Sequence, residues 1–160
     1  MILYDNNFLS DEQIEKILSF QEKTSFTKER REIIYFDKIS LHPASPEFDL
    51  SFLDNKFKKR MFNFIRFQKY DESIEALPKY HGHLDIHNYI IFLNDDFEGG
   101  ELEFECGIII KPKKGSIVYF NNNEFHRVKN CKGTRYTLVL SGNKSIEFEL
   151  FNVRKRNGLI

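Results

Sequence analysis

Residues 89–104 read YIIFLNDDFEGGELEF, which is an apolar run, an acidic turn that ends in two glycines, and a second apolar run. Short apolar runs between turn residues are typical of β-strands. Similar runs lie before and after this stretch, and the expected strands are 81–86, 89–93, 101–105, 108–111, 116–120, 135–141 and 146–153. Because no helical periodicity interrupts the series, we expect an antiparallel sandwich or barrel such as a jelly roll.

The first part of the chain has a different pattern. Ser10 and Gln13 form a capping-box pair, and the apolar spacing that follows predicts a helix over about 11–22. Residues 49–60 have apolar positions at intervals of three and four, which predicts a second helix. These helices are expected to support the sheet from outside.

Three further segments complete the organisation. Residues 32–36 resemble a strand, residues 61–70 turn towards a strand pattern, and the polar segment 71–79 is interpreted as a loop and a candidate lid. The sequence therefore predicts a single domain over 1–160 that is mainly β with supporting N-terminal helices. The helical support covers about 1–60 and the jelly-roll core about 61–153.

Composition excludes several function classes. Lys plus Arg and Asp plus Glu number 24 each, so the formal net charge is zero and no global field attracts nucleic acid or anionic lipid. The first residues lack a signal-peptide pattern, and no apolar run approaches the ~20 residues of a membrane span. We therefore expect a cytoplasmic protein without nucleic-acid or membrane partners. Cys106 and Cys131 have neither metal-site nor scaffold spacing and are expected to be free thiols.

Residues 81–85 read HGHLD and place potential metal ligands at alternate positions. On a strand, His81, His83 and Asp85 would project from one face, and His126 follows the strand at 116–120. Two imidazoles and one carboxylate on one face of an octahedral ion leave three positions open, as non-haem iron(II) requires. An H-x-D pair alone is common by chance, so the metal prediction needs a second feature.

Arg135 supplies that second feature. It lies at the start of an apolar strand, where a charged side chain needs a partner, and Thr137 shares its face. A guanidinium with a neighbouring hydroxyl is a suitable receptor for the carboxylate of a dicarboxylic acid.

Five ordered motifs resemble a known family. They are residues 80–85 (YHGHLD), 92–104 (FLNDDFEGGELEF), 111–115 (KPKKG), 125–128 (FHRV) and 133–136 (GTRY). In this order, over about 61–141, they are similar to the 2-oxoglutarate oxygenases of the prolyl 4-hydroxylase superfamily. The resemblance implies a double-stranded β-helix and the use of Fe(II), 2-oxoglutarate and dioxygen, with ascorbate as an optional reductant.

The resemblance also implies roles for individual residues. His83, Asp85 and His126 would bind Fe(II) as the catalytic centre, and Arg135 would pair with the distal carboxylate of 2-oxoglutarate, assisted by Thr137. Many relatives have a tyrosine, which also contacts that carboxylate, where this chain has Phe92. The hydroxyls that qualify to replace it belong to Thr137, Tyr80 and Tyr70.

The expected reaction is hydroxylation of an unactivated C–H bond, with a prolyl residue of a protein or peptide as the favoured substrate. The alternatives are hydroxylation of a free amino acid or small metabolite, an AlkB-like nucleic-acid oxygenase, and a non-catalytic metal-binding jelly roll. Residues 126–132 (HRVKNCK) lack the R-x-N-x-T-x-R pattern of the AlkB type. His81 is an alternative ligand in a cupin-like H-x-H site, and His87 is a weaker one.

Overall fold

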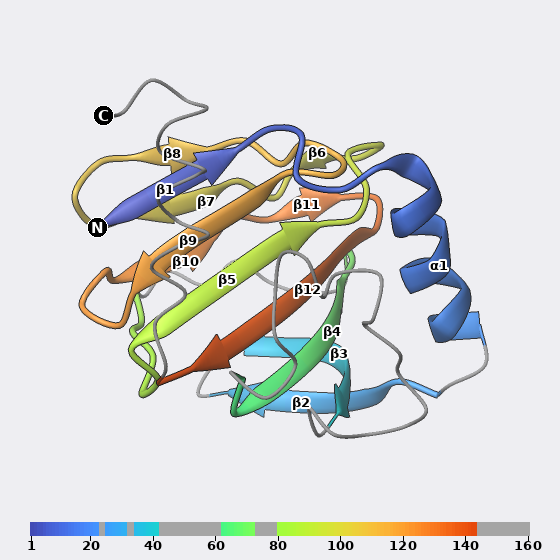
Figure 1. Cartoon of the computed structure of the whole chain (residues 1–160), viewed down its shortest axis with the longest axis horizontal. Helices are drawn as coiled ribbons and strands as arrows, with labels where there is room; N and C mark the ends of the chain where they lie inside the picture. Colours follow the sequence, from blue (N-terminus) through green and yellow to red (C-terminus); the bar gives the residue numbers. More distant parts are fainter. Residues whose placement is uncertain (23–24, 32–33, 42–61, 73–79, 144–160) are drawn as a thin grey trace.

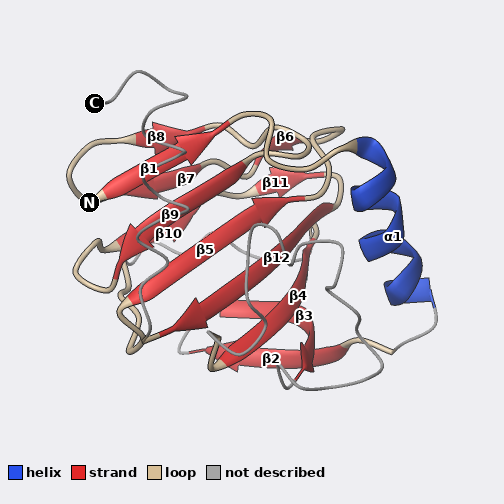
Figure 2. Cartoon of the chain, in the orientation of Figure 1, coloured by secondary structure: helices blue, strands red, loops and turns tan. Residues whose placement is uncertain are grey.

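The computed structural model describes residues 1–22, 25–31, 34–41, 62–72 and 80–143 (Figure 1). The described part is mainly β with a single helix (Figure 2). Its elements are β1 (Ile2–Asp5), α1 (Asp11–Glu22), β2 (Thr27–Arg31), β3 (Ile34–Leu41), β4 (Phe64–Tyr70), β5 (His87–Phe92), β6 (Glu98–Gly99), β7 (Leu102–Phe104), β8 (Ile109–Ile110), β9 (Ile117–Asn121), β10 (His126–Val128), β11 (Cys131–Lys132) and β12 (Arg135–Gly142). The second helix expected over 49–60 and the strand expected over 146–153 lie outside the described residues, as does most of the candidate lid.

A seven-stranded antiparallel sheet forms the centre of the molecule. Its strand order is β1-β9-β5-β12-β4-β3-β2, and β10-β7-β8 and β11-β6 form two smaller sheets. Every described pair of strands is antiparallel. This arrangement is consistent with the expected jelly roll.

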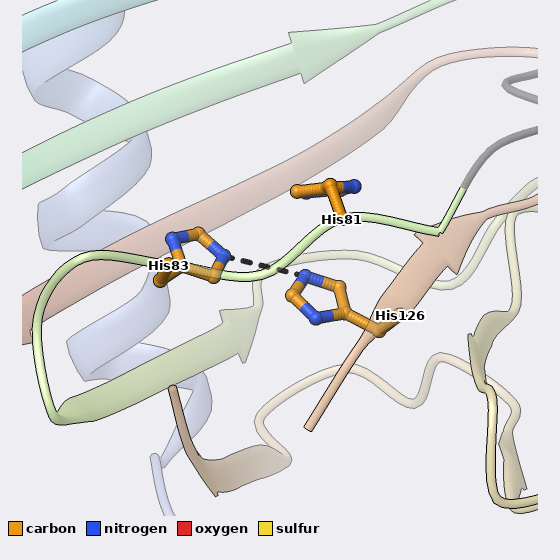
Figure 3. A group of neighbouring side chains, drawn as sticks. All are labelled: His81, His83 and His126. Carbon is orange, nitrogen blue, oxygen red and sulfur yellow. Dashed lines mark hydrogen bonds between the residues drawn. The ribbon is translucent and has the colours of Figure 1, made fainter. Parts of the chain in front are cut away.

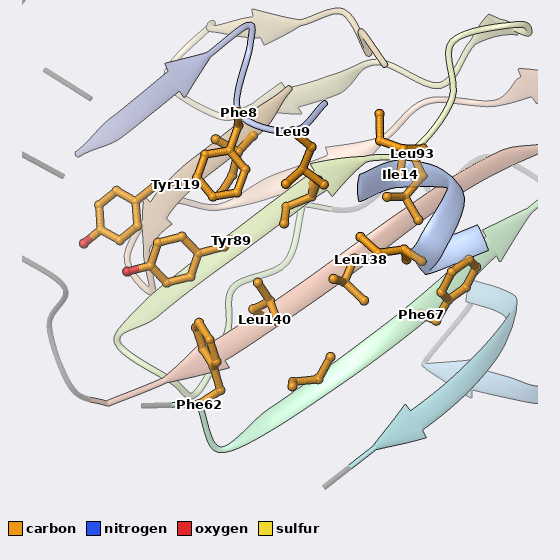
Figure 4. Close-up of a cluster of buried hydrophobic side chains, with 14 of the residues drawn as sticks. Phe8, Leu9, Ile14, Phe62, Phe67, Tyr89, Leu93, Tyr119, Leu138 and Leu140 are labelled. Atoms are coloured by element: carbon orange, nitrogen blue, oxygen red, sulfur yellow. The ribbon is translucent and has the colours of Figure 1, made fainter. Parts of the chain in front are cut away.

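The large sheet has two different faces because side chains alternate along each strand. On one face, Leu138 and Leu140 of β12 pack with Ile91 of β5 and with Ile14 and Ile17 of α1 (Figure 4). On the other face, Ile90 and Phe92 of β5 and Val139 of β12 pack against residues of β7 and β8. The second face therefore closes over the smaller sheet, and the functional site lies on this side.

Helix α1 begins where the capping box predicts. The backbone N–H of Gln13 donates to Ser10 Oγ at 3.3 Å, and the backbone N–H of Ser10 donates to Gln13 Oε1 at 3.0 Å. The carbonyl of Gly115 accepts the backbone N–H groups of Phe8 and Leu9 just before the helix. The turn that precedes β9 thus holds the start of α1 against the sheet.

The strand predictions have mixed outcomes. The helix over 11–22 and the strands that became β4, β5, β9 and β12 are confirmed, with shifts of a few residues at their ends. The strand over 81–86 is wrong: only His81 forms a bridge, with His126, and residues 84–86 are a bend before β5. The region expected to be helical support also contains β1 and β2, which the sequence patterns did not indicate, and β3, which overlaps the strand expected over 32–36. Cys106 and Cys131 are free, as expected.

Candidate functional site

Three histidines gather at the edge of the smaller sheet. His81 and His83 lie on the segment before β5, and His126 is the first residue of β10. Reciprocal backbone hydrogen bonds of 2.9 and 3.0 Å join His81 to His126. One ring nitrogen of each histidine lies within 4.8 Å of the others, and Figure 3 shows the rings of His83 and His126 turned towards each other. Segments far apart in the chain thus bring three potential metal ligands together.

The geometry of His83 and His126 fits a shared metal ion. Their Nε2 atoms are 3.3 Å apart. Two nitrogen ligands at right angles on one ion, each at a bond length of about 2.1 Å, are separated by about 3 Å. The two imidazoles are therefore close to the spacing that a common ion requires.

The proton on His126 is fixed by its surroundings. Its Nδ1 lies 3.0 Å from the carbonyl oxygen of Glu124, so Nδ1 carries the hydrogen and donates, and Nε2 presents its lone pair. Burial lowers the pKa of His126 to about 3, with proximity to His81 adding to the effect and the hydrogen bond to Glu124 opposing it. His126 is therefore a neutral imidazole, which is the form that binds a metal.

Aromatic side chains form the wall behind these two rings. The ring of Phe120 on β9 lies 4.5 Å from that of His126 and 5.7 Å from that of His83, between centroids. Phe104 on β7 lies 5.7 Å from His126. This apolar wall excludes water from one side of the cluster and favours the neutral imidazoles.

Asp85 is not part of the cluster. Its carboxylate accepts a hydrogen bond from the side-chain amide of Asn63, and its carbonyl accepts one of 2.9 Å from Asn88. The bend at 84–86 breaks the alternation that would place Asp85 beside His83, and His81 instead lies beside the pair. The structure thus brings together His83 and His126 of the expected ligand set, together with His81.

Arg135 is buried in a pocket that also contains the histidine cluster. Its side chain is 1% exposed, and its Nε and Nη2 have no hydrogen-bond partner among the described residues. The guanidinium carbon lies 5.3 Å from the ring centre of Tyr70 and 5.2 Å from that of Phe92. The described residues that line the pocket are Arg66, Gln68, Tyr70, His81, His83, Ile90, His126, Val128, Arg135 and Val139.

This guanidinium remains a strong hydrogen-bond donor despite its burial. Burial lowers the pKa of Arg135, but an arginine starts so high that it stays charged. A buried charge with unused N–H groups is costly unless an anion binds to it. The chemistry of Arg135 thus suits an anion such as a carboxylate.

Two residues position Arg135. The side-chain amide of Asn94 donates to the carbonyl of Thr134 at 2.7 Å, and its oxygen accepts the N–H of Tyr136 at 2.8 Å. Gly100 has a φ of +68°, and a Cβ there would lie 3.0 Å from the Cδ of Arg135. The asparagine therefore fixes the backbone on both sides of Arg135, and the glycine leaves room for its side chain.

Thr137 and Tyr80 have different surroundings. Thr137 is buried on the same face of β12 as Arg135, and its hydroxyl lies 3.5 Å from Gln68 Oε1. The hydroxyl of Tyr80 donates to Glu103 Oε1 at 3.0 Å, and Arg127 lies over its ring. Tyr80 is not among the described residues that line the pocket, whereas Tyr70 is.

The chain is similar to known proteins in sequence pattern and in fold. The family model described as the 2OG-Fe(II) oxygenase superfamily matches residues 63–140, the part that contains the histidine cluster and Arg135. Residues 63–140 are therefore similar to the 2OG-Fe(II) oxygenase superfamily, as the ordered motifs suggested. The description of this superfamily implies Fe(II), 2-oxoglutarate and dioxygen for the proteins that it covers. A search of curated proteins finds no sequence relative of the chain.

Solved structures share the fold of this chain. A Pseudomonas putida prolyl-4-hydroxylase is 16% identical with a TM-score of 0.68, and the match covers 90% of this chain and 93% of that one. A Trichoplax adhaerens prolyl hydroxylase, in complex with a hypoxia inducible factor peptide, is 14% identical with a TM-score of 0.66 over 92% and 84%. A Burkholderia pseudomallei 2OG-Fe(II) oxygenase family protein is 14% identical with a TM-score of 0.64 over 88% and 82%. At these identities the likeness shows the fold.

On one wall of the pocket, the sequence patterns identified Tyr70 as a candidate contact but missed Arg66 and Gln68. Arg66, Gln68 and Tyr70 alternate along β4 and face the pocket, while Ile65 and Phe67 face the core beneath α1. The period-two pattern of β4 was a usable signal, but the uncertain boundary between helix and strand near residue 61 concealed it. His87 contacts Tyr119 at 2.9 Å and is outside the cluster. Among the described residues, no helix is both long enough and apolar enough to span a membrane.

Proposed function

We propose that the chain is an Fe(II)- and 2-oxoglutarate-dependent dioxygenase that hydroxylates an unactivated C–H bond. The proposal rests on two features of one pocket. The Nε2 atom of the neutral His126 points towards that of His83. In the same pocket, the buried guanidinium of Arg135 has two N–H groups without a hydrogen-bond partner among the described residues. A metal site and an anion receptor in one pocket match a cosubstrate that chelates a metal and also has a distal carboxylate.

In this proposal His83, Asp85 and His126 are the catalytic metal ligands. Bound iron supplies the activation of dioxygen and the oxidation of the C–H bond. The carbonyl of Glu124 holds His126 in the ligating tautomer, and Phe120 keeps water from the rings. Asp85 follows His83 by two residues and would exchange its hydrogen bond with Asn63 for the metal. His81, which already lies in the cluster, is the alternative third ligand.

Arg135 binds the distal carboxylate of 2-oxoglutarate in the proposal. Of the hydroxyls considered as partners, that of Tyr70 has the best support, because Tyr70 lines the pocket and its ring adjoins the guanidinium. Thr137 contributes by holding Gln68 on the same wall. Tyr80 was predicted to contact the cosubstrate, but its hydroxyl is bonded to Glu103, so we assign it no such contact.

For the substrate we propose a prolyl residue of a protein or peptide as the first candidate. Its support is the fold shared with a prolyl-4-hydroxylase and with a prolyl hydroxylase in complex with a peptide. A free amino acid or another small molecule is the second candidate.

The test combines metal binding with turnover. Purified protein is titrated with Fe(II) and 2-oxoglutarate without oxygen, and succinate is then measured in air with ascorbate, proline-containing peptides and free amino acids. Mass spectrometry should detect one added oxygen atom on the substrate. The proposal is refuted if the wild-type protein neither binds 2-oxoglutarate in the presence of Fe(II) nor forms succinate.

Histidine variants locate the centre. We expect His126→Ala to lose Fe(II) binding and succinate formation, whereas the matched control His87→Ala keeps both, because His87 contacts Tyr119 outside the cluster. Asp85→Ala and His81→Ala identify the third ligand. The proposal expects the larger loss of Fe(II) affinity for Asp85→Ala, and the reverse order would assign that position to His81.

A further inference from the structure

We propose that Asn88 is a positioning residue for the metal ligand Asp85, and that Ser141 holds Asn88 in place for this task. The inference rests on the proposed function, because it takes Asp85 rather than His81 as the third ligand. The side-chain amide of Asn88 donates to the carbonyl oxygen of Asp85 at 2.9 Å, and the hydroxyl of Ser141 donates to Oδ1 of Asn88 at 2.9 Å. Two hydrogen bonds in series thus join β12 to the main chain of the ligand.

Asp85 lies in a bend before β5, and side chains hold the main chain of this bend. Residues 84–86 form the bend and lie outside the strands. The backbone N–H of Ile86 donates to Oδ1 of Asn143, the residue that follows β12, at 3.1 Å. Together with the bond from Asn88, side-chain groups therefore bind the main chain at two consecutive residues of the bend.

Asn88 and Ser141 form a buried polar pair on the face of the sheet that carries the site. They are opposite each other in the register of β5 with β12, where the start of β5 lies beside the end of β12 (Figure 1), and both are 0% exposed. The next residues on the same face, Ile90 and Val139, are apolar. Two apolar side chains would fill this place without the cost of desolvating an amide and a hydroxyl. The polar pair therefore points to a task beyond packing, and its bond to Asp85 indicates which residue it serves.

The carboxylate of Asp85 is held separately from its main chain. It accepts a hydrogen bond from the side-chain amide of Asn63, and the backbone N–H of Asn63 donates to the carbonyl of Ser141 at 2.7 Å. Asn63 is exposed, whereas Asn88 is fully buried. Rotation of the Asp85 side chain can therefore exchange Asn63 for a metal ion while Asn88 keeps the main chain in place. A ligand whose main chain is already ordered loses less conformational entropy when it binds the metal.

The test uses Co(II) as the probe metal, because its visible absorption reports the ligands around the ion. The Co(II) affinity and the absorption spectrum are measured for the wild type, Asp85→Ala, Asn88→Ala and Ser141→Ala, together with urea denaturation of the metal-free proteins. We expect Asn88→Ala to lower the Co(II) affinity about tenfold to a hundredfold. Ser141→Ala removes a single hydroxyl and should lower it about threefold to tenfold. Both spectra should shift towards that of Asp85→Ala.

A double-mutant cycle separates positioning from a general loss of stability. Asn88→Ala and Ser141→Ala are repeated in the Asp85→Ala protein, which has no carboxylate left to position, so their effects on Co(II) affinity should disappear. The matched control is Ser116→Ala, because Ser116 is also 0% exposed and its hydroxyl donates to the carbonyl of Lys113 at 2.6 Å. This control should lower the free energy of unfolding as Ser141→Ala does, and leave the Co(II) affinity and spectrum unchanged.

The outcomes separate this inference from the proposed function. If the wild-type protein binds no Co(II), the proposed function fails together with the inference. If the wild type binds Co(II) and Asp85→Ala binds it equally well, only the inference is overturned, because the third ligand is then His81. The inference alone is also overturned if Ser141→Ala or a folded Asn88→Ala keeps the wild-type affinity, or loses the same factor with and without Asp85.

Discussion

Replacing Arg135 with methionine should change two measurable quantities in opposite directions. The substitution removes a buried positive charge and keeps a long, unbranched side chain of similar reach. Without 2-oxoglutarate, the variant should be as stable as the wild type or more stable. Its affinity for 2-oxoglutarate, in contrast, should fall steeply.

The direction of the stability change follows from the environment of the guanidinium. Burying an ion costs several kcal/mol of desolvation free energy. Hydrogen bonds do not offset this cost at Nε and Nη2 of Arg135, because neither atom has a partner among the described residues. The two aromatic contacts, with Tyr70 and Phe92, return about 0.5–2 kcal/mol each. The remaining cost disappears in the methionine variant, so we expect a gain of about 0–3 kcal/mol in the free energy of unfolding.

The affinity change is larger. Removing one partner of a buried, hydrogen-bonded charge pair costs about 2–5 kcal/mol, which corresponds to a loss of at least about thirtyfold in the affinity for 2-oxoglutarate. Urea denaturation without cosubstrate and calorimetric titration with it measure the two quantities. Arg127→Met is the matched control, because that arginine pairs with Glu103 at 2.9 Å on a half-exposed surface. It should lose a little stability and no affinity. A methionine variant of Arg135 that is less stable than the wild type and binds 2-oxoglutarate equally well would refute the reasoning.

Three further predictions concern single residues. Phe92→Tyr places a hydroxyl beside the Arg135 guanidinium and should raise the affinity for 2-oxoglutarate about threefold to tenfold in calorimetric titration; an unchanged or lower affinity would contradict it. Gly115→Ala should lower the free energy of unfolding in urea by about 2 kcal/mol or more, because φ is +81° and the new Cβ would lie 2.7 Å from the carbonyl oxygen of Leu9. Its control is Gly107→Ala, where φ is +91° but no atom lies within 4 Å, and equal losses at both sites would show that the Leu9 contact is unimportant. Hydrogen bonding from Arg127 holds the pKa of Glu103 below its usual range, so its stabilisation is present above about pH 4.3 and is lost as the pH falls through the lowered pKa. Glu103→Gln should therefore be less stable than the wild type at pH 7 and equally stable in strong acid, and a pH-independent difference in urea denaturation would exclude this origin.

The sequence predicts well those strands that are long and bounded by turns. β5 and β9 have apolar residues on both faces of the sheet, which makes their runs nearly continuous, and β12 has the apolar run Leu138, Val139 and Leu140 at its centre. Strands of two or three residues, such as β6, β10 and β11, are too short to show a period. Their positions depend on pairing with distant segments, which a local pattern does not contain.

The candidate functional site was also predictable from the sequence only in part. His83, His126 and Arg135 are brought into one pocket, as the ordered motifs implied. The position of Asp85 could not be read from its spacing, because the period-two argument requires a strand and the chain bends at 84–86. The placement of His81 depends on its bridge to β10, a contact across 45 residues of sequence separation.

The alternation of β12 has a consequence for how this chain can change over evolution. Arg135 and Val139 face the pocket, whereas Leu138 and Leu140 face the core beneath α1. Substitutions on the pocket side can therefore tune ligand recognition without touching the core. Gain or loss of one residue within the strand would exchange the two sides, placing the guanidinium in hydrocarbon and leucines in the pocket. We expect natural variants of this strand to differ by replacement and to keep its length constant.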